Sequence, residues 1–143
     1  KIHQILRVQY NYRVGKRVAE LKRQLIKYCR DKAKSKYDKG TECFICGSIE
    51  SLEFHHYNGM TELLEKWLKQ QGISNISTAE DIMDIREQFI SENLKEIYDE
   101  TVTLCKTHHQ RLHGIYGKRP QLHTAKKQER WVIKRRDKEY ELV

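Results

Sequence analysis

Cysteine and histidine side chains in this chain occur at spacings that bind metal ions. Two short pairs stand out, Cys43-x-x-Cys46 and Cys105-x-x-His108. Zinc prefers four nitrogen or sulfur ligands in a tetrahedron, and two such pairs brought together supply them. We therefore predict a structural Zn²⁺ held by these four residues, since a small domain with a limited core gains stability from such a staple.

A second set consists of histidines alone. His109 and His113 are four residues apart, so on a helix they project from the same face. His55 and His56 are adjacent, and adjacent residues on a strand point to opposite faces. We expect one of the adjacent pair to join His109 and His113 around a divalent ion and the other to act as a general base. Neutral imidazole suits both roles near neutral pH.

Short elements must position these ligands. Residues 51–57 predict a strand because their side chains alternate, with Phe54 and His56 on one face and Glu53 and His55 on the other. A second β-prone run covers residues 101–104. The run from 106 to 115 predicts a helix that carries the distal histidines.

The segment between the predicted strands has a different character. Residues 60–98 predict two acidic helices, and Ser77-x-x-Glu80 predicts a capping box at the start of the second. The apolar face of that second helix would comprise Ile82, Ile85, Phe89, Leu94 and Ile97, widened by Met83 and Ile90. We expect this inserted pair to pack against the basic helix that precedes the metal ligands. A partner-binding surface is the alternative role for the insertion.

The net charge of +8 is distributed unevenly. Residues 1–39 hold 13 basic and 3 acidic side chains, residues 40–113 hold 6 and 13, and residues 114–143 hold 9 and 4. Basic flanks of this density attract phosphate backbones. Lysine-rich helices can also serve solubility alone, but the strong asymmetry favours a nucleic-acid partner.

The two basic flanks are predicted to be helical. The first helix would run from about Gly15 to Ser35, and a second would cover residues 124–140. Cys29, on the first helix, is predicted to be a buried packing residue, with replacement of His108 as a zinc ligand as the alternative. Metal-type cysteine spacing indicates a reducing, cytoplasmic setting. No apolar run reaches membrane-spanning length, so no membrane partner is expected.

The ligand order resembles a known family. A strand with His55-His56, a second strand, and a helix bearing the remaining ligands is similar to the HNH, or ββα-metal (His-Me finger), endonucleases, and most of all to their zinc-stapled branch. The likeness covers residues 43–57 and 101–116. It implies an α+β, mostly helical fold with a core made of a short hairpin plus a helix.

The charge distribution and the resemblance together predict domain limits. Residues 1–40 would form a basic N-terminal helical arm. Residues 41–116 would form the nuclease core, with its helical insertion at about 60–98. Residues 117–143 would form a basic C-terminal arm.

The resemblance further implies roles for the site residues. His56 matches the general base, and His55, His109 and His113 match the ligands of a catalytic ion. His108 stands where relatives usually have Cys. Mg²⁺ is the cellular candidate, and Mn²⁺, Ni²⁺ or Zn²⁺ also suit an all-histidine shell. Glu100 lies near the position of the family's middle Asn, and Asn58 and Asn93 are the alternatives for that role.

The predicted function is metal-dependent hydrolysis of DNA, double-stranded DNA above all, by a phage-type or homing endonuclease. Its setting would be the cytoplasm of a bacterial or phage-infected host cell. Monomer and homodimer both stay open. The alternative is a non-catalytic zinc-stabilised module that binds nucleic acid. The residues expected to contact phosphates are Arg17, Lys22, Arg23, Arg111, Lys118 and Arg119.

Overall fold

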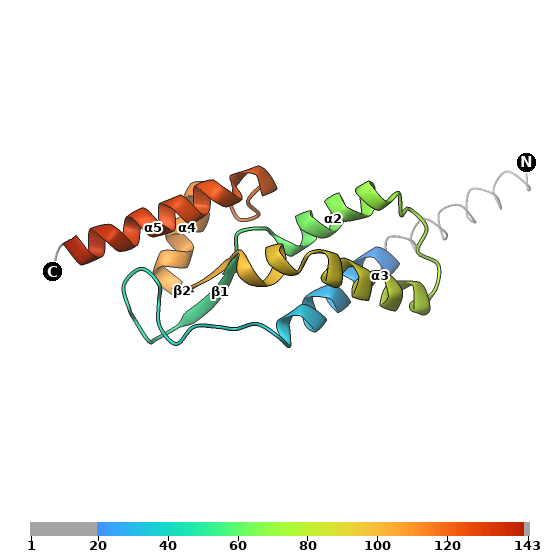
Figure 1. Ribbon diagram of the computed structural model, residues 1–143, viewed down its shortest axis with the longest axis horizontal. Helices are drawn as coiled ribbons and strands as arrows, with labels where there is room; N and C mark the ends of the chain where they lie inside the picture. Colours follow the sequence, from blue (N-terminus) through green and yellow to red (C-terminus); the bar gives the residue numbers. More distant parts are fainter. Residues whose placement is uncertain (1–19, 142–143) are drawn as a thin grey trace, which may run out of the picture.

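The computed structural model describes residues 20–141 and combines helices with one two-stranded sheet (Figure 1). A helix covers residues 20–34. The elements that follow are β1 (Leu52–His56), α2 (Met60–Gln71), α3 (Ala79–Glu92), the π-helical turn η1 (Lys95–Asp99), β2 (Thr101–Cys105), α4 (Lys106–Tyr116), the 3-10 turn η2 (Leu122–Thr124) and α5 (Ala125–Glu141). The predicted mostly helical α+β fold is confirmed. Among the described helices, none is long and apolar enough to cross a membrane.

The sheet is an antiparallel hairpin with a long insertion in place of a turn. Leu52 pairs with Cys105 at one end of the two strands, and His56 pairs with Thr101 at the other. The predicted faces of β1 are confirmed. Phe54 stacks on Tyr37 with ring centroids 4.5 Å apart, whereas the neighbouring His55 contacts α4 and α5 on the other face. Helix α4 follows β2 directly, as its sequence predicts.

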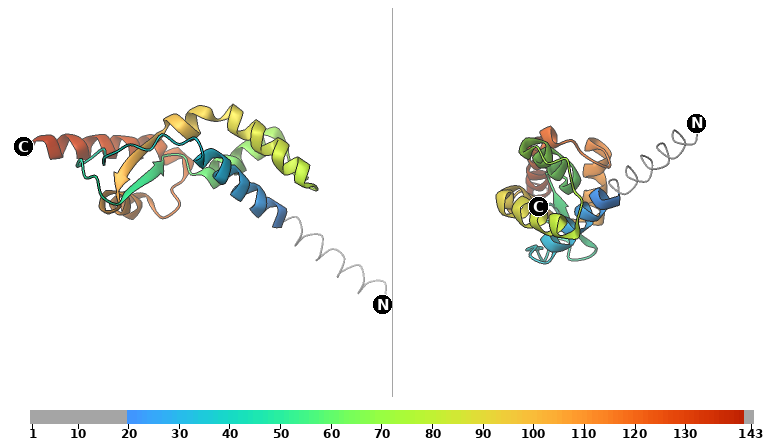
Figure 2. Two further views of the ribbon diagram at one scale, coloured as in Figure 1. Left: turned by 90° about the horizontal axis from the view of Figure 1, so that it is seen from below. Right: turned by 90° about the vertical axis from the view of Figure 1, so that its right-hand side faces the viewer.

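The helix over residues 20–34, together with α2, α3 and η1, forms what we term the helical unit. In Figure 2 the first of these helices (blue) lies beside α3 (yellow) at the end of the molecule away from α5. A hydrogen bond of 2.7 Å joins Arg30 Nη2 to Thr61 Oγ1 of α2. The expected packing of the insertion against the basic helix is therefore confirmed. Residues 15–19 of that predicted helix lie outside the described residues. The unit's core comprises Leu25, Cys29, Ala33, Met60, Leu63, Leu64, Trp67, Leu68, Ile76, Ile82, Ile85, Phe89 and Ile97.

Two details of the predicted insertion are wrong. The capping box of α3 is formed by Thr78 and Asp81, not by Ser77 and Glu80. Thr78 Oγ1 accepts from the Asp81 N–H at 3.1 Å, and the Asp81 carboxylate accepts from the Thr78 N–H at 3.0 Å. Both pairs have the same spacing, so sequence alone does not fix the register.

The predicted apolar face of the second helix is also too long. Helix α3 ends at Glu92, and Asn93 closes it with a bond from Nδ2 to the Phe89 carbonyl. The chain then turns through η1, whose wider winding keeps Ile97 buried and leaves Leu94 52% exposed. Met83 also lies mostly outside the core, at 42% exposure.

The remaining elements form what we term the metal unit: residues 40–57, β2, α4, the segment 117–124 that includes η2, and α5. In Figure 1, α4 and α5 lie at the same end of the molecule, beyond the hairpin. The predicted C-terminal helix is confirmed as α5, which buries Val132 against the hairpin and α4. The core of this unit comprises Cys43, Ile45, Tyr57, Val102, Leu104, Cys105, Leu112 and Val132.

Candidate metal centres

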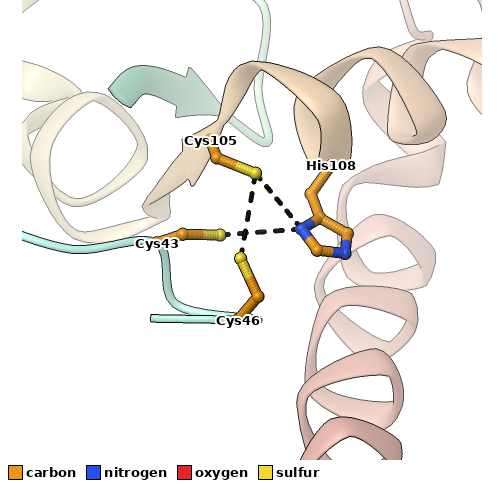
Figure 3. A group of neighbouring side chains, drawn as sticks. All are labelled: Cys43, Cys46, Cys105 and His108. Carbon is orange, nitrogen blue, oxygen red and sulfur yellow. Dashed lines mark hydrogen bonds between the residues drawn. The ribbon is translucent and has the colours of Figure 1, made fainter. Parts of the chain in front are cut away.

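The four predicted zinc ligands come together at one point (Figure 3). Cys43 Sγ lies 3.8 Å from His108 Nδ1, Cys46 Sγ lies 3.9 Å from Cys105 Sγ, and Cys105 Sγ lies 3.3 Å from His108 Nδ1. Ligands about 2.1–2.3 Å from a tetrahedral zinc are roughly 3.4–3.8 Å apart. The four residues are therefore placed to hold a metal ion, and the set of three sulfurs and one nitrogen is compatible with structural zinc.

Backbone turns explain why the two pairs meet. Cys43 and Cys46 lie on a knuckle closed by hydrogen bonds from Cys43 N to Ser48 O at 2.7 Å and from Gly47 N to Cys43 O at 2.8 Å. Gly47 has a φ of 74°, which glycine adopts without strain. The Phe44 N–H bonds Thr103 O at 3.0 Å and so fixes the knuckle to β2. Because Cys105 ends that strand and His108 lies in the first turn of α4, the second pair is held beside the first.

The protonation of Cys43 also favours metal binding. Burial acts to raise the pKa of its thiol, but backbone N–H groups of Cys105, Cys46 and Ile45 together bring the pKa below the ordinary value. A thiolate is the form that binds zinc.

Cys29 lies in the helical unit, away from the four zinc-ligand candidates. It is buried in the core of the helical unit, and burial raises the pKa of its thiol to about 12. The prediction that Cys29 packs is confirmed. The alternative, that it replaces His108 as a zinc ligand, is wrong because His108 lies with the three other cysteines.

Three of the remaining histidines form a second group that could hold a metal ion. His55 comes from β1, and His109 and His113 come from one face of α4. His109 Nε2 lies 3.0 Å from His55 Nδ1 and 3.0 Å from His113 Nε2. Nitrogens bound to one ion at about 2.1 Å are separated by about 3.0–3.4 Å. The structure thus brings together the three histidines predicted to share an ion, and His55 is the member of the adjacent pair that joins them.

The outer nitrogen of each ring has an oxygen partner. His55 Nε2 lies 2.8 Å from Gln128 Oε1, and His109 Nδ1 lies 3.0 Å from Glu53 Oε1. His113 Nδ1 lies 2.9 Å from the carbonyl of Gly117. Each of these oxygens accepts a hydrogen bond. The outer nitrogen of each ring is therefore the donor, and the inner nitrogen turns a lone pair toward the other two rings. Three imidazoles whose inner nitrogens converge in this way fit a divalent cation.

Burial keeps His55 neutral. The side chain is only 4% exposed, and loss of solvation lowers its pKa to about 3. The hydrogen bond to Gln128 opposes this shift, and the other histidines reinforce it. A neutral ring is the form that binds metal.

Two outer partners were not predicted from the sequence. Glu53 could have been found, because it shares a strand face with His55. Gln128 lies on a helix far along the chain, and its only sequence signal is the spacing of Thr124, Gln128 and Val132 along one helical face.

His56 does not lie in the histidine group. Its ring is on the opposite face of β1, with its centroid 4.7 Å from that of Tyr37 and 5.1 Å from that of Phe54. Burial lowers its pKa to about 4, and a hydrogen bond to the Ile97 backbone opposes that shift. Its Nε2 is buried without a hydrogen-bond partner.

A hydrogen-bonded, part-buried pair lies where the resemblance would place an Asn. Asn58 Nδ2 donates to Glu100 Oε2 at 2.6 Å, just where β1 ends and β2 begins. Asn93 is engaged in capping α3. Of the two alternatives, Asn58 is therefore the one that lies beside Glu100.

The predicted phosphate-binding residues are scattered. Arg23, Arg111 and Lys118 are exposed. Lys22 Nζ lies 3.9 Å from a carboxylate oxygen of Glu65. Arg119 Nη2 and Nε lie 2.8 and 2.9 Å from the same oxygen, Oε1 of Glu62 in α2. The Arg119 guanidinium is therefore already paired with an acidic side chain. Arg17 lies outside the described residues.

The sequence matches the phage T5 nicking endonuclease family over residues 17–141, which include every metal-ligand candidate. No solved structure matches the chain. A match of this extent defines the class: the chain belongs to the nicking endonuclease family. Membership implies a nuclease, a hydrolase that acts on DNA.

Proposed function

We propose that this protein is a metal-dependent DNA endonuclease of the HNH type that cuts one strand of a duplex. The observation that carries the proposal is the convergence of three outward-donating imidazoles, from His55, His109 and His113, in a member of the nicking endonuclease family. A module that only binds nucleic acid needs the Cys43 cluster and has no use for a second set of ligands.

The order of elements supports the ββα-metal assignment. Strands β1 and β2 pair and lead directly into α4, and the histidine ligands come from β1 and α4. The core would then span residues 41–116 with its insertion, flanked by arms at 1–40 and 117–143. The described part of the first arm packs into the helical unit, so we propose that it presents its exposed basic face from a fixed position.

In this proposal His55, His109 and His113 hold one divalent ion, Mg²⁺ in the cell, with Mn²⁺, Ni²⁺ and Zn²⁺ as alternatives. When bound, the ion supplies positive charge that stabilises the phosphate and the departing 3′ oxygen. Water forms the new bond to phosphorus, and the bond from phosphorus to the 3′ oxygen breaks. The products are a 5′-phosphate and a 3′-hydroxyl. Cys43, Cys46, Cys105 and His108 hold a structural Zn²⁺ and keep β2, the knuckle and α4 in register.

His56 is the proposed general base. Burial lowers the pKa of its ring to about 4, so the ring is neutral, and Nε2, which has no hydrogen-bond partner, can take a proton from the attacking water. The ring lies on the face of β1 away from the three histidines, where Tyr37 packs on it and Nε2 is covered. This end of β1 must therefore turn His56 toward the ion before Nε2 can meet the attacking water. Arg23, Arg111, Lys118 and Lys22 are the exposed candidates for phosphate contacts. Arg17, outside the described residues, is proposed from the sequence alone.

Relaxation of supercoiled plasmid in Mg²⁺ or Mn²⁺ tests the proposal. Wild-type protein should convert supercoiled DNA to open circles, and His109→Ala should abolish the conversion. His56→Ala should slow it by about 10²–10⁴-fold, the usual contribution of a general base. His123→Ala is the matched control, because His123 is an exposed histidine outside both ligand groups, and it should cut like wild type.

The other outcomes decide between the alternatives. If the wild type binds DNA but nicks it in none of the four metals, the protein is the non-catalytic zinc module instead. Equal rates for His56→Ala and wild type would reject His56 as the base while leaving the metal site in place.

A further inference from the structure

Gln128 is fully buried in a helix whose composition is otherwise highly charged. Its side chain is 0% exposed, whereas its neighbours Lys127 and Glu129 face solvent. It points from α5 into the metal unit and reaches the outer nitrogen of His55. A buried amide without partners is costly, so its contacts must be specific.

The hydrogen-bond partners of Gln128 allow its amide group only one orientation. Its Nε2 lies 2.9 Å from Thr124 Oγ1 and 3.3 Å from the Tyr57 carbonyl. The Tyr57 carbonyl can only accept. The Thr124 hydroxyl already donates to the Gln121 carbonyl at 2.6 Å, so its oxygen is left to accept. Both partners therefore require the NH₂ group of Gln128 on their side.

This orientation of the amide fixes the proton on His55. With the NH₂ group turned toward Tyr57 and Thr124, Oε1 faces His55 Nε2 at 2.8 Å and can only accept. His55 must carry its proton on Nε2. Its Nδ1 then has a free lone pair, 3.0 Å from His109 Nε2. Two backbone carbonyls, those of Tyr57 and Gln121, thus determine through Gln128 which nitrogen of His55 faces the ion.

We propose that Gln128 is a positioning residue of the histidine metal site, one that sets the tautomer and orientation of His55, and that α5 is in consequence part of that site. This inference rests on the proposed function insofar as the three histidines bind the ion. Without the Gln128 oxygen, the buried Nε2–H of His55 has no acceptor. The alternative tautomer would place the proton on Nδ1, where it blocks the lone pair that the ion needs.

Three variants of the full-length, zinc-loaded protein separate this role from simple packing. Gln128→Met keeps the length and removes the acceptor, and should weaken Mn²⁺ binding, measured by electron paramagnetic resonance, by about 10–100-fold. Gln128→Glu keeps an acceptor for His55 Nε2 but turns a carboxylate oxygen toward the Tyr57 carbonyl, so it should bind Mn²⁺ more tightly than Gln128→Met does. Val132→Ala is the matched control, because Val132 is fully buried one turn further along α5 in the core of the metal unit and has no polar atom that could accept from His55.

The tautomer itself can be observed without activity. In Mn²⁺-free wild type, long-range ¹H–¹⁵N correlation of the imidazoles should show His55 protonated on Nε2 alone. Gln128→Met should show a mixture or the Nδ1–H form, and Val132→Ala should match wild type.

Each result has a definite meaning. Wild-type Mn²⁺ affinity in Gln128→Met, an equal loss in Val132→Ala, or a mixed His55 tautomer in wild type would overturn the proposal. If wild type binds Mn²⁺ and shows the single tautomer but never nicks DNA, the nuclease assignment fails and the positioning role stands. If nicking occurs and the tautomer is mixed, the positioning role fails alone.

Discussion

The helical unit and the metal unit differ in what fills their interiors. The core of the helical unit is made almost wholly of aliphatic and aromatic side chains, including Phe89, Leu64 and Trp67. The core of the metal unit is smaller, and two of its members, Cys43 and Cys105, are zinc-ligand candidates. Burial of apolar surface holds the first, whereas the second needs its ligands to be joined.

This difference between the cores predicts which substitutions each unit can tolerate. A small core seldom supplies enough free energy to hold a hairpin and two helices. In the proposed zinc-bound protein, metal coordination would replace the missing apolar contacts and at the same time fix the ligand-bearing strand and helix. The two tryptophans report on the two halves separately, because Trp67 is buried in the helical unit and Trp131 packs against the metal unit.

Removal of a zinc ligand should have the largest effect on the stability of the metal unit relative to the helical unit. Cys105→Ser, or chelation of the wild type, should cost much of the roughly 10–16 kcal/mol that structural zinc contributes and unfold the metal unit. With ¹⁹F-labelled tryptophans, the Trp131 signal should collapse to its unfolded position while the Trp67 signal stays. Cys29→Ala is the control, since it should keep full zinc content. Simultaneous loss of both signals in Cys105→Ser would show that the halves unfold as one.

A cavity in the helical unit should have the opposite pattern. Phe89 is fully buried and its ring lies 5.6 Å from that of Trp67, so Phe89→Ala should cost about 3–5 kcal/mol in the free energy of unfolding. Urea titration should show the loss in the Trp67 signal, with unchanged zinc content. Met83→Ala on the same helix should change the stability by less than about 0.5 kcal/mol, because Met83 is mostly exposed. Zinc loss in Phe89→Ala would contradict the division.

The start of α3 provides a smaller test within the helical unit. Thr78→Ala removes the hydroxyl that accepts from the Asp81 N–H and should cost about 1 kcal/mol in thermal or urea unfolding. Glu80→Ala should have little effect, since Glu80 takes no part in the capping box. A larger loss in Glu80→Ala than in Thr78→Ala would restore the register that the sequence predicts.

The ion pair between the two units should have the smallest effect. Arg119 follows α4 and is largely exposed, and it bonds Glu62 at the start of α2. A double-mutant cycle with Arg119→Ala and Glu62→Gln should give a coupling free energy of about 0.2–1 kcal/mol, reduced further by salt. A coupling well above that range would mean that this contact, and not the cores, holds the units together.

The sequence predicts those parts of the molecule whose causes are local. Ligand spacing identifies the four residues around Cys43 because zinc chemistry needs particular atoms at particular intervals. Alternation along residues 51–57 places His55 and His56 on opposite faces because strand geometry demands it. Neither inference needs knowledge of the tertiary structure.

What the sequence does not predict depends on distant partners. Leu94 has the right spacing for a buried helical face, but the chain changes from α3 to η1 beside it and turns it outward. Arg119 has the composition of a phosphate contact, yet Glu62 reaches it from another unit. Gln128 is one polar residue among many on a charged helix until α5 is seen against His55.

Because a long insertion replaces the turn of the hairpin, the protein could be shortened there. The Tyr57 N–H bonds the Glu100 carbonyl at 3.1 Å, so the chain leaves the metal unit and returns to it at nearly the same point. The intervening segment is therefore a cassette, and a tight turn could close the gap. The helix over residues 20–34 would then lose its cover, since it packs on that cassette. A minimal version must be cut in two places, before residue 40 and across residues 58–99, and it would still carry both ligand sets and α5.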